Sequence, residues 1–263
     1  MSGSLKDRVC VVSGAGPGVG RAVALACAHE GAKLVIAGRS DANTAPLAAE
    51  LEAAGARVAV VQADVAKAED RARLVDGAVR AFGGIDVLVC NAFATGRPGA
   101  LESLDLEKAW RAPFEVNVFG TVALAQAVVP SMKARGGGSV VLVGTLAAHQ
   151  PVAGLSGYGA SKAALEAAAR SLALELGRHK IRVNTVVPGH IDGPNLRIHF
   201  QMEAKRLGIS EDEVRARIAA EGVLDHITTS EEVAEAVLFF ASPRAAAITG
   251  QTLHVNAGQY FAP

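Results

Sequence analysis

Cysteine is scarce in this chain of 263 residues: there are three, and none has the C-x-x-C spacing of a metal or redox site. Cys10, Cys27 and Cys90 fall in or beside apolar segments, which is typical of buried thiols. No histidines stand at metal-ligand spacing either. The sequence therefore predicts neither a disulfide framework nor a metal site.

An excess of charge of either sign is also absent, because 26 Lys and Arg residues balance 26 Asp and Glu residues. Without a basic footprint, binding to nucleic acid or to an anionic membrane surface is not expected. The expected partners are instead a small-molecule substrate and further copies of the chain.

Long apolar runs are missing as well: the longest uninterrupted run, residues 22–28, is far shorter than the ~20 residues that span a bilayer. Residues 1–8 are polar and lack the apolar core of a signal peptide. We therefore expect a soluble, cytoplasmic protein. No linker or charge block divides the chain, so residues 1–263 are expected to form a single domain.

The sequence does contain a regular alternation of short apolar strands and helices. Strands are predicted at 9–13, 33–37, 58–62, 87–90, 139–143, 182–187 and 252–255. Helices are predicted at 21–29, 46–54, 69–82, 106–134 with interruptions at Pro113 and Pro130, 155–176, and from Thr229 onwards. Strands that are apolar on both faces predict an α/β, doubly wound, Rossmann-type fold: a seven-stranded parallel sheet covered by helices on both faces.

Glycine, proline and polar residues lie directly after the predicted strands. They are Gly14, Arg39, Asp64, Asn91, Thr145, Pro188 and Gly189. In an open α/β sheet, ligands bind outside the carboxyl ends of the strands. The pattern therefore predicts a ligand site along this edge.

A glycine-rich turn joins the first strand to the first helix through Gly14, Gly18 and Gly20. Glycine allows the backbone to turn tightly and to approach a pyrophosphate, which the helix N-terminus stabilises. The missing Lys-Ser/Thr pair excludes a P-loop. A plain tight turn is the alternative to dinucleotide binding, which the position between strand and helix favours.

Arg39 follows the second strand, where an acidic residue would bind the ribose hydroxyls of NAD. An arginine at this place can hold the 2′-phosphate of NADP, so NADP is favoured and NAD stays open. The alternative is an Arg39 that stacks on adenine or faces water.

Tyr158 and Lys162 lie four residues apart in the predicted helix 155–176, so they are neighbours on one helix face. A nearby ammonium favours the phenolate and lowers the pKa of a tyrosine from about 10, which makes the pair a candidate for proton transfer. Taken alone, the pair could also be two surface residues at helical spacing. The helix is apolar nearly all round, which predicts burial on more than one side.

These motifs occur together with Asp64-Val65, Asn91-Ala92, Asn117, Pro188-Gly189 and Ile248-Thr249-Gly250-Gln251. In order and spacing they resemble the short-chain dehydrogenase/reductase family, over essentially the whole chain from Lys6 to Gly258.

The resemblance implies a role for each matching residue. Tyr158 would be the general acid/base, and Lys162 would lower its pKa and hold the nicotinamide ribose. Asn117 would anchor a water in a proton relay, and Thr145 stands where the family has a substrate-binding serine. The implied cofactor contacts are Gly14, Gly18, Val19, Gly20, Arg39, Asp64, Val65, Asn91, Ala92, Tyr158, Lys162, Pro188, Gly189 and Ile191.

The chain departs from the family pattern at three places. Phe93 replaces a glycine close to the cofactor. Gly193 replaces a threonine that bonds the carboxamide, so that bond comes from the Ile191 backbone or Asn195, or is absent. Near the C-terminus, Asn256 stands where the family has aspartate, a change that we expect to be structural.

The substrate pocket is expected to include Phe93, Leu155 and His190. Residues 194–227 correspond to the family's substrate lid, with the alternative of a surface helical pair that makes no substrate contact. One predicted lid helix carries the apolar stripe Leu196, Phe200 and Leu207, and the second is capped by Ser210 and Glu213 and carries Val214 and Ile218.

The resemblance implies an oxidoreductase that transfers a hydride between a nicotinamide cofactor and a secondary alcohol or ketone. A 3-ketoacyl thioester reductase and a cofactor-binding regulator without turnover remain as alternatives. Enoyl reductases of the superfamily usually separate tyrosine and lysine by six residues, unlike this chain. The family commonly forms tetramers, so a homotetramer is expected.

Overall fold

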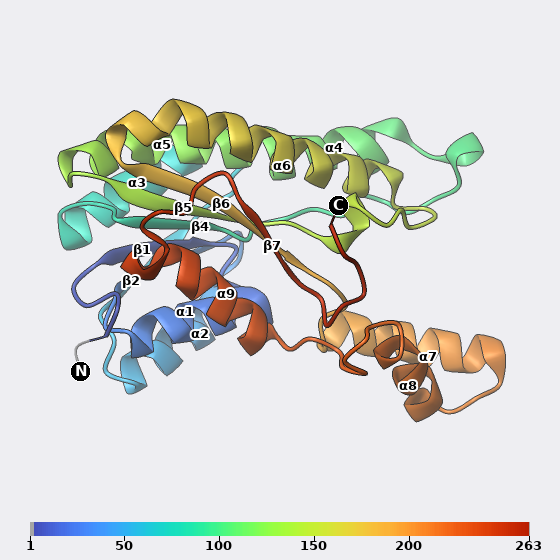
Figure 1. Cartoon of the computed structure of the whole chain (residues 1–263). Coiled ribbons are helices and arrows are strands. Elements are labelled where there is room, and N and C mark those ends of the chain that lie inside the picture. Colours follow the sequence, from blue (N-terminus) through green and yellow to red (C-terminus); the bar gives the residue numbers. More distant parts are fainter. Residues whose placement is uncertain (1–2, 263) are drawn as a thin grey trace.

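The computed structural model describes residues 3–262, apart from the side chains of Pro194 and Asn195. Over this range the strands form one parallel sheet in the order β3-β2-β1-β4-β5-β6-β7 (Figure 1). The strands are β1 (Val9–Ser13), β2 (Lys33–Gly38), β3 (Val58–Gln62), β4 (Val87–Cys90), β5 (Gly138–Val143), β6 (Ile181–Pro188) and β7 (Thr252–Val255). The predicted seven-stranded, doubly wound sheet is confirmed, with β2, β5 and β6 longer by one or two residues.

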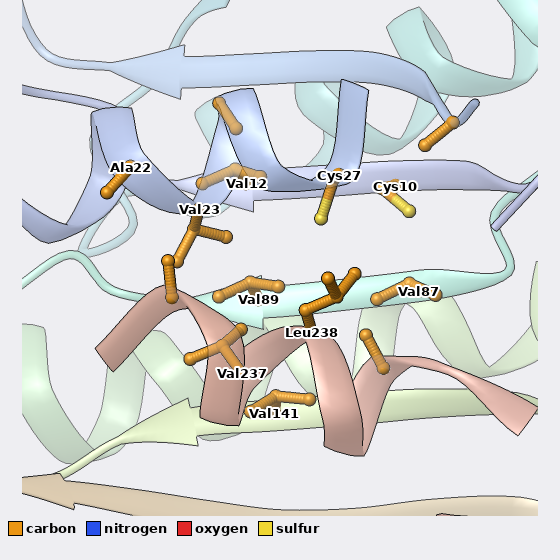
Figure 2. Packing of buried hydrophobic residues seen from close by; sticks show 14 of the residues in the cluster. Cys10, Val12, Ala22, Val23, Cys27, Val87, Val89, Val141, Val237 and Leu238 are labelled. Atoms are coloured by element: carbon orange, nitrogen blue, oxygen red, sulfur yellow. The ribbon is translucent and has the colours of Figure 1, made fainter. Parts of the chain in front are cut away.

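Helices cover both faces of the sheet because side chains of successive strand residues point to opposite sides and both sets are apolar. On one face lie α1 (Val19–His29), α2 (Asp41–Ala53) and α9 (Ser230–Ala241). On the other lie α3 (Ala68–Phe82), α5 (Thr121–Ala134) and α6 (Ser156–Leu176). Figure 2 shows the first layer, where helix residues such as Val23 and Leu238 pack towards the strands. All three cysteines are buried and free, as predicted.

The start of α2 differs from the prediction, because the helix begins at Asp41 and Pro46 lies inside it. The Ser40 hydroxyl accepts a hydrogen bond from the Ala42 N–H at 3.2 Å. This side-chain cap satisfies an amide that the helix itself leaves unpaired. The cap, and not the proline, therefore fixes where the helix begins.

The predicted interruptions at Pro113 and Pro130 are wrong, because the helical path runs from Glu107 through to Ala134. Wide π turns at Glu107–Arg111 and Glu115–Gly120 flank the short α4 (Ala112–Phe114). The Lys108 carbonyl in this region accepts a hydrogen bond from the Arg97 N–H at 3.0 Å. A neighbouring loop thus supplies a donor near the point where a proline interrupts the helical ladder.

By length and composition alone, the helical stretch Glu107–Ala134 is apolar enough to cross a membrane. In the fold, α5 buries Leu124, Val128 and Met132 against the sheet, which is the packing of a core helix. Phe119, in the π turn Glu115–Gly120 just before α5, remains 60% exposed.

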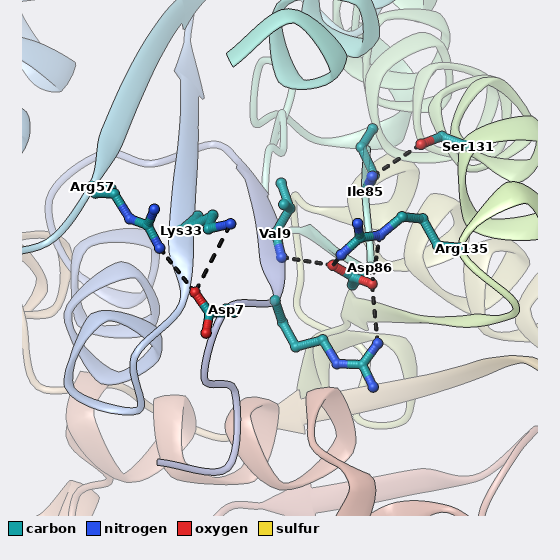
Figure 3. A network of polar contacts seen from close by, with 9 residues as sticks. Asp7, Val9, Lys33, Arg57, Ile85, Asp86, Ser131 and Arg135 are labelled. Atoms are coloured by element: carbon teal, nitrogen blue, oxygen red, sulfur yellow. Dashed lines mark hydrogen bonds and ion pairs between the residues drawn. The ribbon is translucent and has the colours of Figure 1, made fainter. Parts of the chain in front are cut away.

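A carboxylate organises the amino-terminal edge of the sheet, opposite the predicted ligand edge (Figure 3). Asp86 accepts hydrogen bonds from the Val9 N–H at 2.8 Å and from the guanidinium groups of Arg8 and Arg135. Burial raises the pKa of Asp86, but the bonds from Arg135, Val9 and Arg8 outweigh it and hold the pKa below its usual value. The network fixes the start of β1 beside the start of β4.

The two predicted lid helices are α7 (Pro194–Leu207) and α8 (Glu211–Ala219), which lie beyond the carboxyl ends of the strands (Figure 1). Ser210 and Glu213 form the predicted capping box. The helices bury their own apolar cluster of Phe200, Ala204, Val214, Ile218 and Ile227, with Leu196 packed against it. Leu207 was expected in the stripe, but it is 38% exposed at the last turn of α7.

Candidate active site

The glycine-rich turn passes close under the loop that follows β4. Gly14 has φ +78°, and a Cβ at this residue would lie 2.4 Å from the Ala92 nitrogen. A Cβ on Gly20 would lie 2.2 Å from the Gly14 carbonyl oxygen, which also accepts a hydrogen bond from Asn91 Nδ2 at 2.8 Å. Gly14 and Gly20 are therefore required for close packing of backbone on backbone.

The N-terminus of α1 opens towards this turn. Gly18 is its N-cap with φ +89°, no side chain caps it, and its first turn carries no acidic residue. Its free N–H groups and helix dipole can therefore act on an anion such as a pyrophosphate.

A cavity of about 500 Å³ lies between the turn and the ends of β2, β3 and β4. Its lining brings together the predicted residues Gly14, Arg39, Asp64, Val65, Asn91, Ala92 and Phe93. Arg39 is exposed, and its guanidinium forms no ion pair with any residue in the range 3–262. Its carbonyl accepts a hydrogen bond from Gln62 Nε2 at 2.9 Å, which fixes the backbone at the mouth of the cavity.

A second cavity of about 210 Å³ adjoins the first, because Pro17, Asn91 and Phe93 line both. Its lining contains the predicted residues Gly18, Val19, Thr145, Tyr158, Lys162, Pro188, Gly189 and Ile191. Two adjoining compartments that meet at a glycine-rich turn have a shape that can hold a dinucleotide.

Lys162 is buried, with 2% of its surface exposed, and its Nζ donates a hydrogen bond to the Val143 carbonyl at 2.7 Å. Burial lowers the pKa of Lys162 to about 8, while the nearby Cys90 and Glu166 act in the opposite direction. Burial raises the pKa of the Cys90 thiol to about 12, so this cysteine remains a neutral thiol.

The pKa of Tyr158 differs from the sequence-based expectation. Burial raises it above its usual value, and only the Thr145 hydroxyl lowers it. The Lys162 ammonium is directed at the Val143 carbonyl, so the expected depression of the Tyr158 pKa by Lys162 is not found in this arrangement. The phenol is consequently in its protonated form at neutral pH.

Asn117 lines neither cavity. Its fully buried amide accepts from the Ala94 N–H at 2.8 Å and donates to the Ala94 carbonyl and to Ser161 Oγ. Asn117 therefore ties the loop after β4 to α6, one residue before Lys162. A role in a water-mediated proton relay remains a prediction.

The three expected substrate-pocket residues have different positions. The Phe93 ring is 6.4 Å from the Tyr158 ring, centroid to centroid, and lines both cavities. Leu155 is the N-cap residue of α6 and is not among the lining residues of either cavity. His190 is turned towards Glu221, with Nε2 and Oε2 3.2 Å apart, and lies outside the lining as well. Asn195 lies outside the residues whose side chains are described.

Sequence reasoning missed several residues at the site. Ser230 lines the smaller cavity, although it was expected only as part of a helix start after Thr229. Ser161, which accepts from Asn117, could have been noticed because it directly precedes Lys162. Among residues 3–262, no group of histidine, cysteine and carboxylate side chains could hold a metal ion.

A family model described as "Enoyl-(Acyl carrier protein) reductase" matches residues 14–259. Dehydrogenase/reductase SDR family member 4 of Oryctolagus cuniculus is 38% identical over 97% of this chain and 94% of the relative. The short-chain reductase protein NovJ of Streptomyces niveus is 34% identical over 97% of this chain and 94% of that protein. The chain belongs to the short-chain dehydrogenase/reductase family.

The fold is similar to the solved structure of L-sorbose reductase from Gluconobacter frateurii, complexed with NADPH and L-sorbose. It has 32% sequence identity and a TM-score of 0.93, and the match covers 100% of both chains. The short-chain dehydrogenase/reductase described here is accordingly a nicotinamide-dependent oxidoreductase that transfers a hydride.

The close approach of the Gly14 and Ala92 backbones predicts that a side chain at position 14 lowers the stability of the fold. Replacing Gly14 with alanine forces a Cβ into the Ala92 backbone at positive φ, so we expect a loss of at least about 1–2 kcal/mol in the free energy of unfolding. Denaturant titration of the purified protein measures it. The control is Gly16→Ala in the same turn, since a Cβ there meets nothing within 4 Å. Equal stability of the two variants would contradict the close approach at Gly14.

Proposed function

We propose that this enzyme reduces a ketone to a secondary alcohol with NADPH, using Tyr158 as the proton donor. The observation that carries the proposal is the convergence of Tyr158, Lys162 and Thr145 on one cavity that continues to Arg39 at the other end. The NADPH-bound relative with a TM-score of 0.93 supports the same reading of the two compartments.

Each residue of the small cavity has a task that follows from its chemistry. The hydroxyls of Thr145 and Tyr158 donate hydrogen bonds to the substrate carbonyl oxygen, which orients and polarises it. When bound, the nicotinamide supplies the hydride. Tyr158 then gives its proton to the developing alkoxide, and the Lys162 ammonium stabilises the phenolate that remains. Phe93 presents an aromatic wall next to Tyr158, although Phe93 itself is 46% exposed.

The separation of the tyrosine and the lysine argues for ketone reduction over enoyl reduction. Tyr158 and Lys162 are four residues apart on α6, whereas the enoyl reductases of this superfamily usually separate the two by six. The matching family model nevertheless bears the name of an acyl-carrier enzyme. A 3-ketoacyl thioester is therefore tested beside simple ketones and a ketose.

Substituting Tyr158 with phenylalanine removes the proton donor and keeps the ring, so we expect the turnover rate to fall about 10²–10⁴-fold with NADPH binding retained. Steady-state reduction of a panel of ketones, with NADPH affinity from cofactor fluorescence, measures both. Tyr260→Phe is the matched control, because Tyr260 is the chain's only other tyrosine. An active Tyr158→Phe enzyme would disprove the mechanism. Absence of turnover and of cofactor binding in the native protein would favour a regulator.

Arg39 is proposed to bind the 2′-phosphate of NADPH, because its exposed guanidinium lines the larger cavity and pairs with no carboxylate in residues 3–262. Loss of a charge-assisted hydrogen bond in Arg39→Ala is expected to weaken NADPH binding about 10–100-fold and to leave NADH binding nearly unchanged. Calorimetry with both cofactors measures this, with exposed Arg178→Ala as control. Equal losses for NADPH and NADH would mean that Arg39 contacts only the shared part of the cofactor.

A homotetramer is proposed from the apolar surface that one chain leaves uncovered. Leu106, Phe119 and Leu174 are 64%, 60% and 86% exposed, and they lie on the α4–α5 and α6 side of the sheet. Leu106 and Phe119 line one surface hollow with Trp110 and Phe114, and an apolar patch of this kind is typical of a subunit contact. Light scattering after size-exclusion chromatography is expected to give about four times 26.9 kDa. Phe119→Glu should reduce that mass, whereas Val79→Glu on α3 should not; a monomeric native protein would refute the assembly.

A further inference from the structure

A buried carboxylate continues the row of functional side chains along α6. Tyr158, Lys162 and Glu166 are spaced four residues apart, so they lie on one face of the helix. Lys162 and Glu166 are 2% and 5% exposed. We propose that Glu166, held by His149, is a positioning residue that keeps Lys162 in its charged form. The proposal rests on the proposed role of Lys162 beside Tyr158.

The surroundings of Lys162 leave its charge poorly compensated. Its Nζ has one hydrogen-bond partner in the described part of the chain, the neutral carbonyl of Val143. No carboxylate oxygen of residues 3–262 lies within ion-pair distance of it. A buried ammonium with a single neutral acceptor loses its proton easily. Nearby negative charge therefore decides how much of Lys162 is charged at neutral pH.

Glu166 is the carboxylate placed to supply that charge. It lies one helical turn beyond Lys162 and behind the end of β5, where a Cβ on Gly144 would be 3.4 Å from its Oε1. The pKa of Lys162 is about 8 because of burial, and Glu166 is among the groups that raise it. Cys90, on β4, stays a neutral thiol because its own pKa is about 12, so Glu166 is the remaining anionic contributor.

His149 holds Glu166 in place from the loop after β5. Its Nε2 is 3.2 Å from Glu166 Oε1 and 3.1 Å from Oε2. Burial holds the pKa of Glu166 above its usual value, and the charge and hydrogen bond of His149 reduce that rise. Arg170, one turn further along α6, also lowers it. The His149 contact thus favours the carboxylate form on which the effect at Lys162 depends.

The outer side of this cluster is formed by β7 and the C-terminal segment. The ring of His149 is 4.9 Å from that of His254 and 5.1 Å from that of Tyr260, centroid to centroid. Burial and the nearby His149 lower the pKa of His254, which favours its neutral form. His254 and Tyr260 therefore pack against the ring of His149, and His149 is the direct hydrogen-bond partner of Glu166.

The test is the titration of Lys162 in the protein without cofactor or substrate. Its amine is trace-labelled with acetic anhydride between pH 6 and 10, and the Lys162 peptide is quantified by mass spectrometry against exposed Lys67 and Lys133. Lys162 lines the smaller cavity, through which a small reagent can approach. Removal of the anion in Glu166→Gln is expected to lower the labelling midpoint by about half a pH unit to one unit.

His149→Gln is expected to shift the midpoint in the same direction, and the double variant should shift it no further than Glu166→Gln alone, because both act through one charge. Glu175→Gln, an exposed carboxylate on the same helix, should leave the midpoint in place. An unchanged midpoint in Glu166→Gln overturns the proposal. If that variant does not fold, an unchanged midpoint in His149→Gln does so.

The pH dependence of catalysis distinguishes a positioning role of Glu166 from a merely structural one. In Glu166→Gln, kcat/KM for ketone reduction is expected to match the native value near pH 6 and to fall earlier than the native value as pH rises, since Lys162 is charged in both proteins at low pH. A uniform loss at every pH would assign Glu166 to packing. The labelling experiment needs no turnover, so its result stands independently of whether Tyr158 is the proton donor.

Discussion

The burial of the Lys162 ammonium is the constraint on which the geometry of this site depends. A charged side chain that is 2% exposed is costly unless polar groups face it. Its hydrogen bond goes to the carbonyl of Val143, the last residue of β5. That bond requires the loop 144–155 to bring α6 back so that the second turn of the helix lies over the end of β5. Tyr158, one turn earlier, then lines the same cavity as Lys162.

Two further contacts connect the loops at this edge into one unit. Gly14 carries no side chain, so the turn after β1 can lie against the backbone at Ala92 after β4. Asn117 bonds the next part of that loop, at Ala94, to Ser161 on α6. The glycine-rich turn, the loop after β4 and α6 are therefore fixed relative to one another.

The helices α7 and α8 pack separately from these loops and from α6. Its apolar cluster, formed by Phe200, Val214, Ile218 and neighbours, is separate from the two clusters that cover the faces of the sheet. Changes of sequence in α7 and α8 can therefore be accommodated without disturbing the residues that hold Lys162 and Tyr158. This division is consistent with one sheet edge serving many substrates across a family.

The strands and the ligand edge could be predicted from the sequence because each strand is apolar on both faces and ends in glycine or a polar residue. The interactions that decide where α2 begins, and whether a helix continues past a proline, could not be predicted from the sequence. Ser40 starts α2 ahead of Pro46, and the Arg97 N–H supports the helical path near Pro113, an interaction that depends on the tertiary structure. The direction of the Lys162 side chain likewise depends on where β5 ends. Helical spacing places Lys162 beside Tyr158, but it does not tell which acceptor the ammonium selects.

That choice of acceptor bears on the direction of the reaction. Reduction needs a protonated phenol, and burial of Tyr158 raises its pKa, so the proton is in place at neutral pH. Oxidation needs the phenolate, which requires the Lys162 ammonium to act on the phenol oxygen and to remain charged as the pH rises. The pKa of Lys162 is about 8, so its charge is lost over the alkaline range in which the phenol would ionise. The protonation states of the two side chains at neutral pH are therefore those that the proposed ketone reduction requires, and any group that keeps Lys162 charged extends the pH range in which the phenolate of Tyr158 is stabilised.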